Sequence, residues 1–178
     1  KPGDLTAAEW DEVKRHPYYG FELIRQNSGI SAKAAHVAYQ HHERMSGQGY
    51  PRGLAGNNIH LYGRIVAVAD SYDAMTSDRV YRRGKEPYDA LREIRSLRGT
   101  YYDCDAVDAL LDNIYPYPIG CTVELDSGEI GVVVDVHRKK KNRPVVRLQY
   151  DANGCRCENV KIDLLQESQR TIRRIVVG

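Results

Sequence analysis

The stretch from His41 to Pro51 reads HHERMSGQGYP, so two adjacent histidines are followed closely by glycines and a proline. Residues 31–44, which run into it, are rich in alanine and lack glycine and proline, and this composition predicts a helix. Residues 46–58 contain four glycines and one proline, which predicts a loop. Long ordered loops in compact domains are often functional, so the histidines and this loop are the first candidate for a site.

Helical patterns continue on both sides of this stretch. Thr6 and Glu9 form a capping box, which predicts the start of a first helix. This helix is expected to end near His16, directly before Pro17. Pro17 disfavours helical geometry in the residue before it and suits the first turn of a second helix. Apolar residues at helical spacing predict three more helices further along the chain. The six expected helices cover residues 6–16, 17–27, 31–44, 59–77, 87–97 and 105–114.

The helix expected over residues 59–77 carries carboxylates among apolar side chains. Asp70 and Asp73 lie one turn apart in it. Carboxylates in an apolar helix are rarely buried unless they are paired or bound to a cation, so Asp70 is a candidate ligand. Asp73 is open to two interpretations, as an acceptor that orients a metal-bound histidine or as an anion on the helix surface. The apolar residues expected to make this helix central and buried are Ile65, Val66, Val68, Ala69 and Tyr72.

The character of the sequence changes at residues 115–118, which read YPYP. Two prolines in four residues make a stiff boundary, and short strand patterns separated by turn residues follow it. We therefore expect a mainly α protein, with a helical body over residues 1–115 and a small β-rich, barrel-like appendage over residues 116–178. The expected strands cover residues 122–125, 130–136, 145–150 and 160–162.

The composition excludes several classes of protein. The 178 residues are 42% hydrophobic and 28% charged, which is an ordinary balance for a globular chain. Because no apolar run is long enough to cross a bilayer, a cytoplasmic protein is expected, with an anchor outside this sequence left open. The formal net charge is only +2, and the basic run Arg138–Arg143 is interpreted as a solvated turn. No nucleic acid polymer is therefore expected as a partner.

The histidine pair at His41 and His42 has two interpretations. At the end of a helix, two histidines can be surface cations that stabilise the helix C-terminus. Adjacent helical residues point about 100° apart, so a pair that binds metal is expected to serve two neighbouring ions, or an ion and its substrate. Two residues elsewhere, His16 and Asp70, add the mixture of imidazole and carboxylate that is typical of iron, manganese or zinc sites.

Arginines follow the helix that carries Asp70. Arg79, Arg82 and Arg83 can clamp phosphate oxygens through their guanidinium groups. Metal ligands beside phosphate clamps predict metal-assisted phosphoryl chemistry, in which an activated water attacks phosphorus.

Taken together, these motifs resemble those of HD-GYP domains, a bacterial branch of the HD metal-dependent phosphohydrolases. Residues 41–51 resemble the family signature HHExxDGxGYP. Residues 1–20, with KPGDLTAAEW and HPYYG, resemble its KPGxLTxxEW and HPxxG segments. Residues 64–82 resemble its RIxxVADxYDAxTS helix and the DRPYR continuation. The resemblance covers residues 1–115 and implies that they form an HD-type helical bundle, and the β tail is similar to an extension found after many such domains.

The resemblance implies a set of metal ligands. His16, His41, His42 and Asp70 fall on the ligand positions of a site that holds two or three divalent transition-metal ions, iron or manganese. His41, His42 and Asp70 would act in catalysis through a metal-bound water. The implied activity is hydrolysis of cyclic di-GMP to pGpG, which some members continue to GMP. The alternative is a catalytically inactive HD-GYP-type domain that binds cyclic di-GMP or a partner protein.

The resemblance also implies how substrate and partners bind. Arg79 and Arg82 fall on positions that contact the phosphates of cyclic di-GMP. Gly49, Tyr50 and Pro51 form a loop that takes part in substrate binding and in the recognition of a GGDEF-type protein. An upstream regulatory or sensory domain is expected, and a homodimer is considered.

The chain departs from the family pattern in two respects. The His-Asp pair that names the family precedes the segment that starts at Lys1, so we expect this sequence to be a portion of a longer protein. Ser46 stands where the family has aspartate, which is expected to alter the support of the loop rather than metal binding. Glu43 is expected to pair with Arg44 or with Arg64, and the sequence leaves both open.

Overall fold

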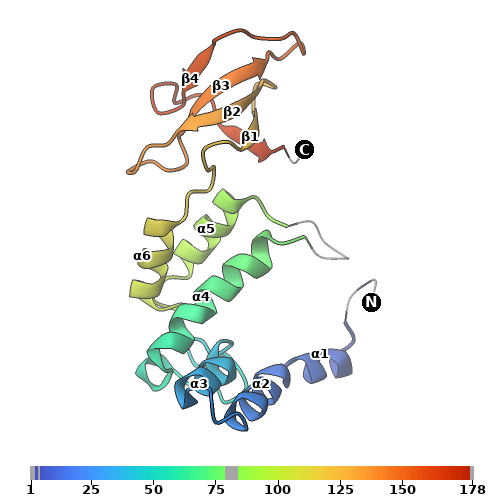
Figure 1. The fold of residues 1–178 in the computed structure, drawn as a ribbon, viewed down its shortest axis with the longest axis vertical. Coiled ribbons are helices and arrows are strands. Elements are labelled where there is room, and N and C mark those ends of the chain that lie inside the picture. The colour runs from blue at the N-terminus through green and yellow to red at the C-terminus, as the bar shows by residue number, and fades with distance from the viewer. Residues whose placement is uncertain (1–2, 4, 79–83, 177–178) are drawn as a thin grey trace. The chain divides into compact units, whose positions relative to one another are not determined.

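The computed structural model describes residue 3, residues 5–78 and residues 84–176, and it divides into two compact units. The first unit comprises residues 1–85 and 89–113, and the second comprises residues 86–88 and 114–178. Helices build the first unit, and an antiparallel sheet builds the second (Figure 1). The expected helical body followed by a β-rich appendage is therefore confirmed.

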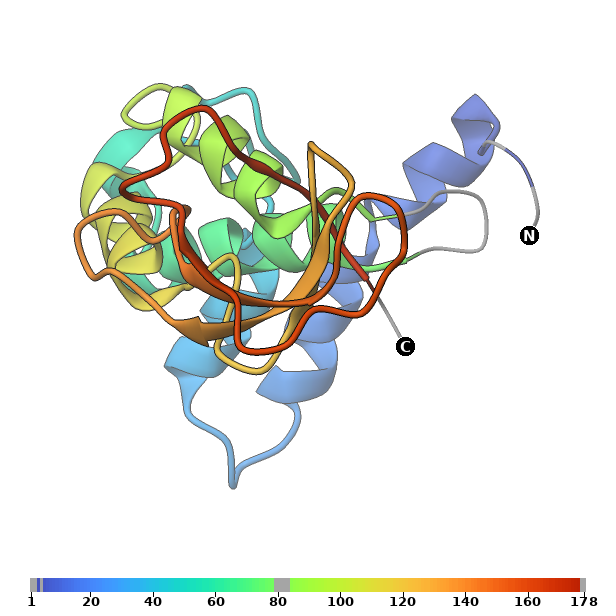
Figure 2. The same ribbon diagram turned by 90° about the horizontal axis from the view of Figure 1, so that it is seen from above.

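The helical elements agree with the expected order, and most of them begin or end within a few residues of the expected positions. The capping box at the first helix is present, because the Thr6 side chain accepts a hydrogen bond from the Glu9 N–H and the Glu9 side chain accepts one from the Thr6 N–H. Both views show α1 extending away from the later helices (Figure 1, Figure 2), and α1 buries none of its residues. The helices are α1 (Ala7–Val13), α2 (His16–Arg25), α3 (Ala32–Gln40), α4 (Leu61–Thr76), α5 (Pro87–Ser96) and α6 (Cys104–Asn113), with a short 3-10 helix η1 (Gly56–Asn58).

Two helix ends differ from the prediction, and both affect the candidate site. The first helix ends at Val13, so His16 opens α2 instead of closing α1. The second residue of α2 is Pro17, which lacks an N–H and fits a first turn, where that donor has no helical partner. The third helix ends at Gln40 rather than at Arg44, because the backbone turns and the Glu43 N–H donates to the Gln40 carbonyl.

The prediction that α4 is buried around its apolar stripe is wrong. Val68 is buried, but Ile65 is 46% exposed and Val66 is 36% exposed. The buried residues of α4 are the small residues Gly63, Ala67 and Ser71 together with Val68, and α4 packs against α3 and α6. The core of the helical unit comprises Val68, Ile94, Tyr102, Ala106 and Val107, so α5 and α6 face inward at Ile94 and Val107.

The second unit is a five-stranded antiparallel sheet in the order β4-β3-β2-β1-β5. Its core is formed by one face of the strands, and Val123, Leu125, Val133 and Val146 are fully buried there. The last strand was not located in the sequence, and closure into a barrel stays a prediction. The strands are β1 (Thr122–Leu125), β2 (Ile130–Asp135), β3 (Val145–Tyr150), β4 (Lys161–Asp163) and β5 (Ile172–Ile175).

Three further features concern the basic turn, the cysteines and the length of the helices. The basic run Arg138–Arg143 forms turns between β2 and β3, and its first three residues are exposed, as predicted. All four cysteines are free thiols. Within the described part of the chain, no helix has both the length and the apolar character that a membrane span requires.

Candidate metal centre

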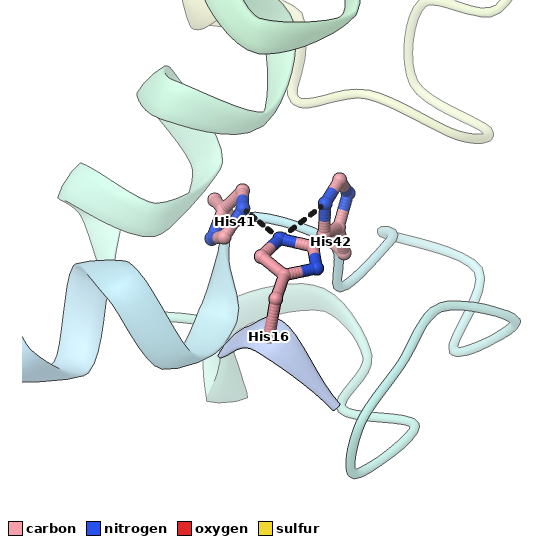
Figure 3. Close-up of side chains that lie close together, drawn as sticks. All are labelled: His16, His41 and His42. Atoms are coloured by element: carbon pink, nitrogen blue, oxygen red, sulfur yellow. Dashed lines mark hydrogen bonds between the residues drawn. The ribbon is translucent and has the colours of Figure 1, made fainter. Parts of the chain in front are cut away.

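Three histidines from two helix ends and the following turn converge at one point (Figure 3). His16 is the first residue of α2, His41 caps the C-terminus of α3, and His42 follows it. The Nε2 atom of His16 lies 3.2 Å from Nε2 of His41 and 3.1 Å from Nε2 of His42. Each histidine offers one ring nitrogen, and these nitrogens lie within 4.8 Å of one another.

Backbone carbonyls orient two of the three rings. Nδ1 of His16 lies 2.7 Å from the Val13 carbonyl oxygen, and Nδ1 of His41 lies 2.8 Å from the Ala38 carbonyl oxygen. A carbonyl oxygen only accepts, so each Nδ1 carries a hydrogen and a neutral ring keeps its lone pair on Nε2. The lone pairs of His16 and His41 therefore face each other across 3.2 Å, an arrangement that a shared cation stabilises.

The spacing of the nitrogens fits a transition-metal ion. Two nitrogen ligands that bind one ion at about 2.1 Å, about a right angle apart, are separated by about 3 Å. The two Nε2 separations in the cluster, 3.1 and 3.2 Å, agree with this value. Neutral imidazole suits iron, zinc, copper and nickel better than it suits magnesium or calcium. The three residues can therefore hold such an ion.

Burial keeps these imidazoles in the form that binds metal. Burial lowers the pKa of His41 below its ordinary value. Burial, together with repulsion from protonated His41 and His16, lowers the pKa of His42 to about 3. Both rings are therefore neutral at pH 7, and a metal ion does not have to displace a proton from them.

The arrangement of His41 and His42 differs from the prediction of two rings that diverge on a helix. Because α3 ends at Gln40, the rings lie next to each other, with centroids 4.1 Å apart and planes inclined by 41°. Both therefore reach His16, and the geometric reason for assigning them to separate ions was wrong.

Asp70 lies beside the cluster, on the Nδ1 side of the His42 ring. Its Oδ2 atom is 3.8 Å from Nδ1 of His42, whereas Nε2 of that ring faces His16. A carboxylate at this position can orient a ligating histidine, which is how ligating rings are commonly held. Direct binding of metal by Asp70 stays a prediction. Asp73 is exposed and accepts a hydrogen bond from the Ser77 hydroxyl, in agreement with a surface anion.

The loop after the histidines lies directly against them. The Tyr50 ring stacks on the His42 ring, with centroids 4.6 Å apart, and the Tyr50 N–H donates to the His42 carbonyl at 3.1 Å. A Cβ atom at Gly49 would lie 2.5 Å from the His42 carbonyl oxygen, so only glycine allows this approach. The Tyr50–Pro51 peptide bond is cis. Gly49 and Tyr50, two of the predicted substrate-binding residues, therefore lie against the histidine cluster.

Comparison with known proteins places this arrangement in a family. Residues 1–106 match the family model described as "HD domain", and residues 122–178 match a "KOW domain associated with HD domain". The chain belongs to the HD domain family. The three histidines and the loop against them lie in the part that matches the HD domain.

Relatives of this HD domain protein include named phosphodiesterases. A cyclic di-GMP phosphodiesterase of Pseudomonas aeruginosa is 39% identical over 86% of this chain and 37% of its own length. A cyclic di-GMP phosphodiesterase of Thermotoga maritima is 48% identical over 62% of this chain and 30% of its own length. A 3'3'-cGAMP-specific phosphodiesterase of Vibrio cholerae is 34% identical over 64% of this chain and 22% of its own length. The chain thus spans between about a fifth and two fifths of these relatives.

Two buried polar residues, Glu43 and Gln40, bind backbone groups around the cluster; the sequence did not reveal the partners of Glu43, and it did not single out Gln40. Glu43 pairs with neither of the expected arginines. Its carboxylate accepts hydrogen bonds from the N–H groups of Arg52 and Leu54 at 2.8 and 2.9 Å. The Gln40 side chain accepts one from the His60 N–H at 2.7 Å. Their partners are backbone groups of the loop and of the start of α4, which no pairing of side-chain types in the sequence could indicate.

Three arginines of the HD domain are predicted to clamp the phosphates of the substrate. Arg79, Arg82 and Arg83 lie outside the described residues. Their role in substrate binding stays a prediction from the sequence.

Proposed function

We propose that this HD domain forms part of the active site of a metal-dependent phosphodiesterase that hydrolyses cyclic di-GMP. The observation that carries the proposal is the convergence of three histidine nitrogens, two of them with lone pairs directed at each other. The cyclic di-GMP phosphodiesterases of Pseudomonas aeruginosa and Thermotoga maritima, which are similar to this chain, support the choice of substrate.

In this proposal His16, His41 and His42 bind metal through Nε2, and Asp70 either holds the His42 ring or completes the ligand set. A bound divalent transition metal supplies an activated water near neutral pH and neutralises charge on phosphoryl oxygens. Iron or manganese, in two or three sites, is the proposed cofactor.

In this proposal the other site residues bind the substrate or keep water away from the cluster. Tyr50 covers one face of the His42 ring, so it shields that side of the cluster from solvent. Together with Gly49 and Pro51 it would line the place where a nucleotide enters. Arg79 and Arg82 would hold the phosphates through charge-assisted hydrogen bonds. Water adds to one phosphorus atom and a ribose oxygen leaves, which opens the cyclic dinucleotide to linear pGpG, and cleavage of the second ester would give GMP.

Further proposals concern the whole protein. Residues 1–115 and 116–178 would be separate domains, in line with the change of composition at the YPYP segment. We also propose a cytoplasmic protein with an upstream sensory domain, a GGDEF-type partner that binds residues 49–51, and a homodimer. These features would link the level of cyclic di-GMP to a signal received elsewhere in the protein.

An activity assay with two substrates tests the proposal. The full-length protein, prepared anaerobically with ferrous or manganous ions, should convert cyclic di-GMP to pGpG, measured by chromatography. The related 3'3'-cGAMP-specific enzyme makes 3'3'-cGAMP the substrate to compare. Equal or faster turnover of 3'3'-cGAMP would contradict the assignment of cyclic di-GMP. Binding of cyclic di-GMP without turnover under either metal would favour the inactive signalling module.

Matched histidine variants link the activity to the cluster. His16→Ala and His41→Ala should abolish turnover, because each removes a nitrogen from the point of convergence. His36→Ala is the control, because His36 is an exposed residue of α3 whose ring lies against Phe21. Activity that survives in His41→Ala would contradict the proposed centre.

A further inference from the structure

The substrate loop, residues 46–58, is tied to the histidine turn by a charged side chain that lies inside the protein. Glu43 is 1% exposed. Within the described part of the chain, its two carboxylate oxygens are held by two backbone N–H groups, from Arg52 and Leu54, rather than by a cation. Burial of a carboxylate is costly unless strong hydrogen bonds replace its water, so this residue has a specific task.

The two bonds fix the part of the loop that follows the predicted substrate-binding residues. Arg52 comes directly after Pro51, and Leu54 lies two residues further on. On the other side of Pro51, the Tyr50 N–H donates to the carbonyl of His42, the residue before Glu43. The loop is therefore attached to His42 and Glu43 on both sides of Pro51.

The approach of the loop also depends on Gly49. A Cβ atom there would lie 2.5 Å from the Glu43 Cα and 2.6 Å from the Arg44 backbone nitrogen, which is far inside van der Waals contact. Glycine thus lets the loop backbone touch the turn, and the Glu43 carboxylate then holds it there.

Arg44, the charged residue next to Glu43, has a different role. The Arg44 guanidinium donates to the carbonyls of His41 and Glu43 at 2.9 and 3.0 Å, and it lies over the Tyr101 ring. Arg44 therefore stabilises the turn that carries the histidines, whereas Glu43 holds the loop. Because the two side chains do not pair with each other, a change at Glu43 can release the loop and leave the histidine turn in place.

We infer that Glu43 is a positioning residue, whose carboxylate sets the distance between the metal-binding histidines and the loop that binds the substrate. This inference rests on the proposed function. Loss of the carboxylate should weaken substrate binding without removing metal, because the rings of His16 and His41 keep their own Nδ1 hydrogen bonds to backbone carbonyls.

The test is Glu43→Gln in the full-length protein. Glutamine has the same shape, but its amide oxygen can accept only at one end, and its NH2 group faces the second N–H donor. We expect KM for cyclic di-GMP to rise on the order of tenfold, the size of a lost charge-assisted hydrogen bond. We expect kcat to stay within about twofold, because the variant changes the binding of substrate in its ground and transition states alike. Metal content per chain should not change, and amide hydrogen exchange at Arg52 and Leu54 should accelerate.

Two outcomes would overturn the inference. A parallel loss of metal and kcat would show that Glu43 supports the histidine turn itself. An unchanged KM with accelerated exchange in the loop would show that the loop position does not matter for substrate.

A second variant covers the case in which Glu43→Gln does not fold. Gly49→Ala pushes the loop away from the turn and leaves the carboxylate intact, and it should give the same rise in KM with unchanged metal. An unchanged KM in this variant would overturn the inference. If the wild-type protein shows no turnover, the proposed activity fails by itself, and calorimetric binding of cyclic di-GMP replaces KM. Equal affinities of the wild-type protein and Glu43→Gln would then overturn the role of Glu43.

Discussion

The Nε2 atoms of His16 and His41 lie 3.2 Å apart, although 25 positions separate the two residues in the sequence. Each ring donates its Nδ1 hydrogen to a carbonyl three residues earlier, so neither can rotate away without losing a hydrogen bond. The pair is therefore fixed with both acceptor nitrogens directed at one point. Predictions for metal binding, substrate binding and stability follow from this pair and from other contacts of the chain.

Metal should stabilise the protein through this pair. A divalent transition metal at about one hundred times its Kd adds about 2.7 kcal/mol to the free energy of unfolding. The midpoint of thermal unfolding should therefore rise when ferrous or manganous ions are added, and fall again with a chelator. His16→Ala should abolish the shift, whereas His60→Ala should retain it, because His60 caps α4 outside the cluster. Elemental analysis of both variants gives the metal content, and an unaltered content in His16→Ala would disprove this ligand.

Arg82→Ala should weaken substrate more than metal. A guanidinium that binds phosphate makes charge-assisted hydrogen bonds, and losing one costs about 1.5–3 kcal/mol. The expected result is a rise in KM for cyclic di-GMP of at least about tenfold, with metal content unchanged. Arg138→Ala, in an exposed turn of the sheet unit, is the matched control. Equal KM values for the two variants would remove Arg82 from the binding site.

The ion pair between Arg64 and Asp103 should make stability depend on acidity. Their side chains meet at 2.6 Å, and Asp103 also accepts from the N–H groups of Asp105 and Ala106 at the start of α6. Burial alone would raise the pKa of Asp103, but these N–H groups and Arg64 together hold it below the ordinary value of 3.8. The stabilisation is therefore fully present above pH 4 and is lost as the pH falls through the lowered pKa.

Asp103→Asn tests this dependence. Asparagine can still cap the helix but leaves Arg64 without its anion, so the free energy of unfolding at pH 7 should fall by about 2 kcal/mol. Denaturant unfolding at pH 7 and at pH 3 measures the difference between the variant and the wild-type protein. The difference should shrink at pH 3, and an equal difference at both values would contradict the role of the charge.

The exposed apolar face of α4 gives a further prediction. Val68→Ala removes a side chain that is 1% exposed and should lower the free energy of unfolding of this chain by about 1–3 kcal/mol. Ile65→Ala, on the same helix, should change it by no more than about 0.5 kcal/mol. Urea unfolding of both variants compares the two faces of α4. A loss of several kcal/mol in Ile65→Ala would show that this face is covered.

The success of the sequence predictions depended on the range of the interactions involved. The capping box at Thr6 and Glu9 and the start of a helix around Pro17 depend on neighbours within three or four residues, and both were predicted. The burial of Ile65 depends on which elements lie against α4, and helical periodicity does not contain that information. A period of 3.6 identifies an apolar face, but it does not say whether the face is covered.

The candidate site shows the same division. His16, His41 and His42 were all singled out in the sequence, and the structure brings them together. Their mutual geometry was predicted wrongly, because α3 ends at Gln40, where the backbone turns and the Glu43 N–H donates to the Gln40 carbonyl, although the residue types there predict that the helix continues. Glu43 was noticed as a charge that needs a partner, but its partners are backbone groups nine and eleven residues away, which have no signature in the sequence.

The carbonyl groups of Val13 and Ala38 have a consequence for how such a centre changes over evolutionary time. These carbonyls orient two of the rings, and every amino acid supplies the same carbonyl group. Selection that preserves the centre therefore acts on the histidines and on the path of the backbone, and the orientation of the rings places no demand on which side chain stands at position 13 or 38. The residue types at these two positions therefore carry no trace of the task, although both positions determine where the ligand nitrogens point.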